Sequence, residues 1–123
     1  MQILEKEKIS ALIQIGFAGC AKGQIFQARR LFEGLLCADS ELVGAKIGLA
    51  FSYIVVDDFD KADQILDELL VSHSDDADVK AMKVFSLALQ KKSEEAKKLA
   101  SSVDASQQSA YNLCQDALNL LDR

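Results

Sequence analysis

Apolar and small residues recur along the chain at spacings of three and four, which places them on one face of a helix. The same stripe occurs three times with a period of 34 residues, at Ala28, Leu31 and Leu35, at Ala62, Ile65 and Leu69, and at Ala96, Leu99 and Val103. Each stripe follows a short polar turn. The pattern predicts three equivalent helices that belong to a repeat array.

A second ladder of residues lies in the other half of each repeat. Phe17, Phe51 and Phe85 are also spaced 34 residues apart. Gly16 and Ala50 precede the first two phenylalanines, and both are small where two helices must approach closely. A larger residue there would overpack the helix crossing at a cost of about 1–3 kcal/mol. Two helices per repeat, joined as hairpins, are therefore expected.

Both ends of the chain continue the helical pattern. The segment Gln107–Leu121 carries one apolar stripe, at Ala110, Leu113, Cys114, Ala117, Leu118 and Leu121. Repeat arrays need a terminal helix to cover the last exposed core face, so this segment is expected to be a capping helix. Gln2–Lys8 is expected to extend the first helix, because its charged residues are good helix formers. Ser74, followed by Asp75 and Asp76, is expected to cap a helix start.

The 34-residue period, with small residues on both helices of a hairpin, resembles the tetratricopeptide repeat family across about residues 9–104. The resemblance implies an all-α fold, a right-handed superhelix of three helical hairpins plus a C-terminal capping helix. A single domain over residues 1–123 is expected, with repeats at about 9–42, 43–76 and 77–106 and the capping helix at about 107–122. The third repeat departs most from the pattern, with Val84 at a small position and Ala100 at a large one.

In this family the first helix of each hairpin lines the concave inner wall. The resemblance assigns nine apolar residues to that wall: Ile13, Phe17, Cys20, Ile47, Phe51, Ile54, Ala81, Phe85 and Ala88. A large exposed apolar patch marks an interaction site, and an amphipathic helix is its natural ligand. The alternative is that the phenylalanines are core, covered by the chain's own C-terminal helix or by a second copy of the chain.

Composition narrows the classes of function. The 123-residue chain is half hydrophobic, contains no proline, and carries a formal net charge of −5. Nucleic acids and anionic membrane surfaces are therefore poor partners, because both attract basic proteins. The N-terminus has no apolar signal segment, and the three cysteines are scattered, which suits a reducing compartment. A cytoplasmic protein is expected.

Catalytic and metal-binding chemistry finds little support in the sequence. His73 is the single histidine and lies in a polar turn, so no catalytic, cofactor or metal site is expected. The acidic run Asp57–Asp60 lacks calcium-loop spacing and is interpreted as a turn with a helix cap. Arg29 and Arg30 are expected to pair with Glu33 on the surface. The basic residues of the first helices, Lys46, Lys80 and Lys83, are expected to form a solvated face.

The chain is most similar in size, acidity and groove chemistry to the small tetratricopeptide chaperones of bacterial type III secretion. That resemblance implies a non-catalytic, cytoplasmic bacterial protein whose groove holds an amphipathic helix of a needle-type export subunit, with a small helical co-chaperone as a further partner. Two alternatives stay open. The chain could be an adaptor in a larger assembly unrelated to secretion, or a homodimer whose grooves close on each other.

Overall fold

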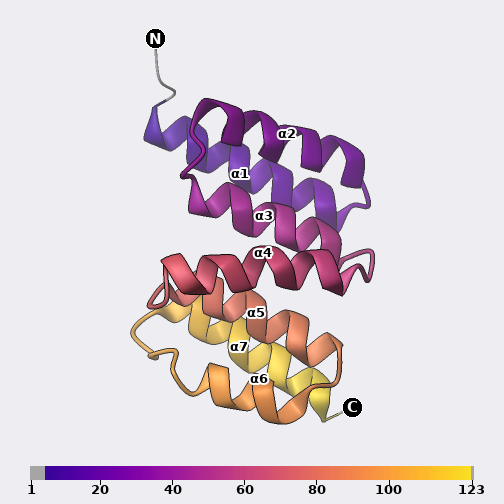
Figure 1. The fold of residues 1–123 in the computed structure, drawn as a ribbon, viewed down its shortest axis with the longest axis vertical. Helices are drawn as coiled ribbons and strands as arrows, with labels where there is room; N and C mark the ends of the chain where they lie inside the picture. The colour runs from indigo at the N-terminus through magenta and orange to yellow at the C-terminus, as the bar shows by residue number, and fades with distance from the viewer. Residues whose placement is uncertain (1–4, 123) are drawn as a thin grey trace. The chain divides into compact units, whose positions relative to one another are not determined.

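The computed structural model describes residues 5–122, which fold into seven α-helices joined by turns and contain no strand (Figure 1). The helices are α1 (Lys6–Ala21), α2 (Ile25–Ala38), α3 (Val43–Ile54), α4 (Phe59–Ser72), α5 (Ala77–Leu89), α6 (Ser93–Ala100) and α7 (Gln108–Leu121). The all-α prediction is confirmed. Helix α1 begins at Lys6 with Glu5 as its N-cap, and the expected extension over Gln2–Leu4 lies outside the described residues.

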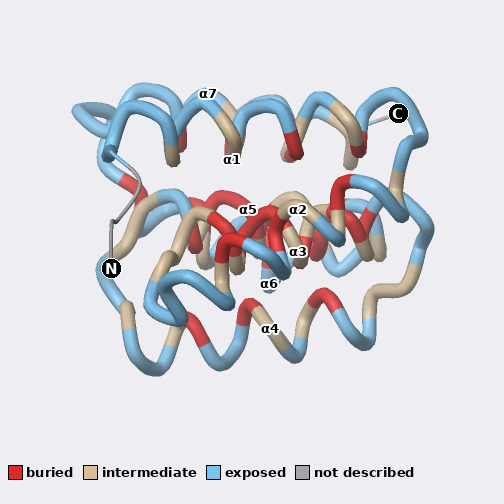
Figure 2. Tube along the Cα trace, turned by 90° about the horizontal axis from the view of Figure 1, so that it is seen from above, coloured by how far each residue is buried: buried red, intermediate tan, exposed pale blue. Residues whose placement is uncertain are grey.

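Contacts divide the chain into two compact units, and the boundary falls inside α4, between Ile65 and Leu66. The expected single domain and its repeat boundaries stay predictions. Helix α4 itself is amphipathic, because its buried residues come about once per turn (Figure 2). These residues are Ala62, Leu66 and Leu69, two of which lie on the stripe that the sequence predicts.

In the first unit, α2 packs against both α1 and α3, and α1 also packs against α3. The buried core contains Cys20, Ala28, Phe32, Leu35 and Ala45. Gly16 and Ala28, small residues expected where α1 and α2 approach closely, are both buried, and a Cβ at Gly16 would overlap the Phe32 ring of α2.

In the second unit, α5 packs against both α6 and α7. Val84 and Ala100, the two residues that depart from the repeat pattern, share one buried core with Cys114 and Ala117 of α7. The C-terminal helix therefore covers the core face of the preceding hairpin, as expected for a capping helix. Its predicted start, Gln107, is the N-cap of the observed helix.

The turn between the two helices of each hairpin has the same backbone form. Gly23, Asp57 and Lys91, again 34 residues apart, have φ angles of 83°, 62° and 63°. Glycine adopts this left-handed conformation without steric cost and aspartate tolerates it, whereas lysine is strained there. Asp58 Oδ1 accepts from the Lys61 backbone N–H at 3.4 Å, which agrees with the turn and helix cap expected at this run.

The start of α5 differs from the sequence prediction. Its cap is Asp76, whose side chain accepts from the backbone N–H groups of Asp78 and Val79 at 2.9 and 3.2 Å. Ser74, the expected cap, lies two residues before this position. Asp76 directly precedes the first residue of α5, so its carboxylate, and not the Ser74 hydroxyl, accepts from the backbone N–H groups of the first turn.

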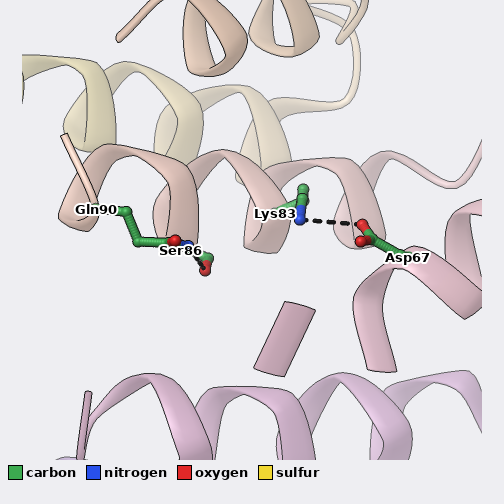
Figure 3. Close-up of polar contacts among 4 residues, drawn as sticks. All are labelled: Asp67, Lys83, Ser86 and Gln90. Atoms are coloured by element: carbon green, nitrogen blue, oxygen red, sulfur yellow. Dashed lines mark hydrogen bonds and ion pairs between the residues drawn. The ribbon is translucent and has the colours of Figure 1, made fainter. Parts of the chain in front are cut away.

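The polar side of α5 is also less solvated than expected. The Lys83 side chain is only 12% exposed, and its Nζ lies 3.0 Å from Oδ1 of Asp67 (Figure 3). One turn further on, Gln90 Nε2 donates to Oγ of the fully buried Ser86 at 3.0 Å (Figure 3). The prediction of a solvated lysine at position 83 is wrong, because a carboxylate from α4 compensates the buried ammonium group.

Candidate functional site

The centre of the candidate site is a pair of aromatic rings on the first helices of neighbouring hairpins. The rings of Phe17 on α1 and Phe51 on α3 have centroids 5.3 Å apart and planes tilted by 34°. Both side chains are half-buried, so each ring packs on one side and keeps part of its surface accessible. A contact between these two hairpins is what the 34-residue register predicts.

Phe32 of α2 packs against the Phe17 ring of this pair. Its ring meets the Phe17 ring edge-on, with centroids 5.7 Å apart and planes at 70°, a favourable geometry for aromatic pairs. Phe32 is fully buried, and its ring fills the space that a Cβ at Gly16 or Gly48 would occupy. Phe17 and Phe51 therefore lie on a closely packed core.

Sequence reasoning missed both Phe32 and Gly48. A signal was present, because glycine inside a helix costs about 1 kcal/mol relative to alanine and so calls for a packing reason. Gly16 and Gly48 lie inside α1 and α3, and neither occupies a turn. Two such glycines on neighbouring helices indicate that a large side chain lies between them.

Ile13 extends the apolar surface one turn before Phe17. Its Cδ1 atom would lie 3.0 Å from a Cβ built at Gly44 of α3, so its side chain lies directly against the neighbouring first helix. Ile13 is half-buried, as are Phe17 and Phe51. The three side chains form what we call the aromatic surface of the first unit.

Burial separates the nine predicted groove residues into two sets. Those that keep accessible surface are Ile13, Phe17, Phe51 and Phe85, and those that are buried are Cys20, Ile47, Ile54, Ala81 and Ala88. In the second unit, Ala81 and Ala88 lie in the core that α5 shares with α7, and Phe85 packs against the same core. Ala81 and Ala88 are therefore part of the chain's own core, whereas the alternatives for the three phenylalanines stay open.

In the first unit, a cluster of polar contacts joins α2 to α3. Arg29 Nε donates to Ser52 Oγ at 3.0 Å and Arg29 Nη2 donates to the Ser52 carbonyl at 3.2 Å. Its guanidinium carbon lies 3.9 Å from the centroid of the Tyr53 ring, and Lys61 Nζ lies 5.5 Å from it. Sequence analysis assigned Arg29 to surface pairing within α2, but the structure directs it across to α3.

The two buried thiols, Cys20 and Cys114, are poorly suited to nucleophilic chemistry. Burial raises the pKa of the Cys20 thiol, and the nearby Arg29 cation offsets this only in part. Burial likewise raises the pKa of the Cys114 thiol. A raised pKa keeps a thiol protonated at neutral pH, and the thiolate is the reactive form.

Residues 5–122 contain no cluster of metal-ligating side chains. No group of three or more histidine, cysteine, aspartate or glutamate side chains is placed to hold a metal ion within this range. His73 is half-buried after α4, with its Nδ1 2.8 Å from Oγ of Ser72. None of the helices described is long and apolar enough to cross a membrane.

Comparison with known proteins identifies the repeat. The tetratricopeptide repeat family model matches residues 21–84, which is more than half of the chain. No curated protein and no solved structure matches the chain.

Proposed function

Because the chain belongs to the tetratricopeptide repeat family, whose repeats mediate protein–protein interactions, we propose that it is a non-catalytic module that binds an amphipathic helix. The observation that carries this proposal is the ring pair of Phe17 and Phe51, whose centroids lie 5.3 Å apart and which keep part of their surface accessible. Paired aromatic rings offer a large apolar contact with little conformational entropy to lose. They suit the apolar face of a helix, whose side chains recur every three or four residues.

The physical basis of binding would be burial of apolar area. Phe17, Phe51 and Ile13 would each lose their remaining accessible surface under a bound helix. Each Å² of apolar area buried in this way contributes about 25 cal/mol of favourable free energy. A specific, stable complex buries about 800 Å² on each partner.

We further propose that the partner is a needle-type export subunit and that the chain acts as a bacterial type III secretion chaperone. The resemblance in size, acidity and apolar groove residues supports this more specific role. The mechanism is competition, because the groove would bury the apolar stripe that otherwise drives subunits to assemble into open helical filaments. The subunit would then stay monomeric until export.

The first experiment identifies the partner. The chain is isolated under gentle conditions from the cells that produce it, and the co-purifying protein is identified by mass. A short helical protein of less than about 100 residues is expected, since chains of that size often lack a sufficient core of their own. The purified partner should remain monomeric in sedimentation when the chain is present and form polymers when it is absent.

The second experiment tests the aromatic surface with a matched pair of variants. Phe51→Asp should abolish binding of that partner while leaving the far-ultraviolet circular dichroism of the chain nearly unchanged. Phe26→Asp makes the same substitution at a ring that is 68% exposed on α2, outside the aromatic surface, and should bind like the native chain.

Three results would count against the proposal. Loss of helicity in Phe51→Asp would assign Phe51 to the core. Equal binding by Phe51→Asp and the native chain would place the partner elsewhere. A partner that never polymerises and takes no part in export would favour the adaptor role over the secretion chaperone.

A further inference from the structure

One exposed side of α1 carries no charged side chain between residues 9 and 21. We call its residues Ala11, Gln14, Ile15 and Ala18 the outer face of α1. All four are exposed, and Ile15 is 60% exposed. From residue 9 to residue 21 the helix contains no charged side chain, whereas an exposed helix face is ordinarily charged or polar. An exposed, uncharged face that carries an isoleucine and two alanines indicates a surface that another molecule covers.

The equivalent positions of the next repeat are covered by another helix, and those of the outer face of α1 are not. The residues 34 positions later on α3 are Ala45, Gly48, Leu49 and Ser52, none of which is exposed. They are covered by α2, whose Phe32 ring lies on Gly48 and whose Arg29 bonds to Ser52. Within residues 5–122, α1 packs against α2 and α3 alone, and no helix covers the equivalent positions of α1.

A further repeat helix would fit this face poorly. Gln14 stands where Gly48 accommodates a phenylalanine ring, and Ala18 stands where Ser52 accepts from an arginine. A helix with the side chains of α2 would clash at the first position and leave its arginine unpaired at the second. The face instead calls for a helix with small side chains opposite Ala11 and Ala18.

Helix α1 meets this requirement itself. We propose that the outer face of α1 is covered by α1 of a second copy of the chain, packed antiparallel about a two-fold axis between Gln14 and Ile15. That symmetry places Ala11 opposite Ala18 of the second copy, and Ala18 opposite Ala11. Small residues at these positions let the two helix axes approach to the short end of the usual 8–10 Å range. The exposed Ile15 side chain then becomes buried.

Charge complementarity at the ends selects the antiparallel orientation. The same two-fold axis places Glu7 opposite Lys22 of the second copy, and this happens twice, once at each end of the contact. Both residues are exposed at opposite ends of α1. A parallel pair in register would instead bring like charges together at each end.

The interface is independent of the aromatic surface and therefore of the proposed function. A 16-residue helix is about 24 Å long, so a single helix pair buries less than a standard-size interface. The dimer should accordingly be reversible, with dissociation in the micromolar range, and weaker at high salt because the terminal ion pairs are exposed.

Sedimentation equilibrium of the full chain tests the proposal. The native chain should dimerise, and Ala18→Glu should weaken the dimer at least about 100-fold by placing a charge in the contact. Ala105→Glu makes the same substitution in an exposed turn and should not change the dissociation constant. Phe51→Asp should dimerise normally, which separates this interface from a dimer closed through the aromatic surface.

Disulfide trapping tests the register and orientation. Cys37, the exposed cysteine, is first replaced by serine. In that background, a mixture of Ala11→Cys and Ala18→Cys chains should form a disulfide between the two variants. Each variant alone should not, because identical positions lie seven residues apart across the axis, or about 10 Å along the helix.

The outcomes decide the proposal in either direction. A chain that stays monomeric at millimolar concentration overturns it, as does a dimer that tolerates Ala18→Glu. Preferential disulfide formation by Ala11→Cys alone would indicate a parallel pair and overturn the antiparallel arrangement. A charge-reversed double variant, Glu7→Lys with Lys22→Glu, should recover the dimer that Glu7→Lys alone weakens.

Discussion

Phe32 and Gly48 form one contact between α2 and α3, in which the ring occupies the space that a side chain at Gly48 would need. The ring is fully buried and lies closely against both Gly16 and Gly48. We expect Gly48→Ala to destabilise the chain by about 1–3 kcal/mol, because a new Cβ must push the ring or the helix aside. Urea unfolding followed by circular dichroism at the helical band measures the change.

Gly34→Ala is the matched control for this substitution. Gly34 lies inside α2 and is exposed, and a Cβ there would meet no atom within 4 Å. Alanine favours a helix by up to about 1 kcal/mol over glycine, so this variant should be more stable than the native chain. The same sign for both substitutions would contradict the contact described for Phe32.

Arg29 is expected to stabilise the packing of α2 on α3. Arg29→Ala removes two hydrogen bonds to Ser52 and the contact with the Tyr53 ring. The Ser52 hydroxyl still donates to the Leu49 carbonyl at 2.6 Å, so it keeps one partner. A loss of about 1–3 kcal/mol is expected for hydrogen bonds from a charged donor, and thermal or urea unfolding measures it.

Two further variants refine the test of Arg29. Arg30→Ala removes the neighbouring exposed arginine and should change the free energy of unfolding by less than about 0.5 kcal/mol. Arg29→Lys keeps the charge but not the planar, two-donor geometry, so only part of the stability should return. Full recovery with lysine would show that charge alone matters.

Lys91 offers a route to a more stable chain. Its φ of 63° is left-handed, and this conformation costs a residue with a Cβ about 1–2 kcal/mol. Lys91→Gly should therefore stabilise the chain by about 0.5–1 kcal/mol after the greater freedom of glycine in the unfolded state is allowed for. Lys97→Gly, inside α6 and exposed, should destabilise it by about 1 kcal/mol.

The buried thiol of Cys114 makes stability depend on pH. Burial raises its pKa in the folded chain above the ordinary value of 9.0, so the folded state holds the proton at a pH where the unfolded state has lost it. The free energy of unfolding should consequently be constant below that value and fall as the pH rises past it. Unfolding in reductant at pH 7 and pH 9.5 measures the fall, which should be smaller in Cys114→Ala.

The hairpin pattern was readable from sequence because it depends on local spacing. Apolar residues at intervals of three and four define one helix face wherever the chain goes, so the stripe through Ala62 and Leu69 predicted an amphipathic α4. The 34-residue offset of Phe17 and Phe51 predicted that two first helices are equivalent, and their rings are in contact. The C-terminal stripe likewise predicted α7 to within one residue.

The partners of individual side chains could not be predicted from the sequence, since they depend on which segment covers which helix face. Arg29 and Lys83 both resembled surface residues, yet one bonds to α3 and the other is nearly buried beside Asp67. Spacing identifies the face on which a side chain lies. It does not identify the residue from a distant segment that meets it.

Local periodicity by itself determined that this protein is a set of helical hairpins with small residues at the crossings and a helix at the end. Tertiary structure alone decided which equivalent positions are covered. Ala11 and Ala45 occupy the same repeat position, but Ala11 is exposed on α1 and Ala45 is fully buried under α2. The physical reason is that burial is a property of the neighbouring element: α2 packs on this position of α3, whereas no helix within residues 5–122 packs on the same position of α1.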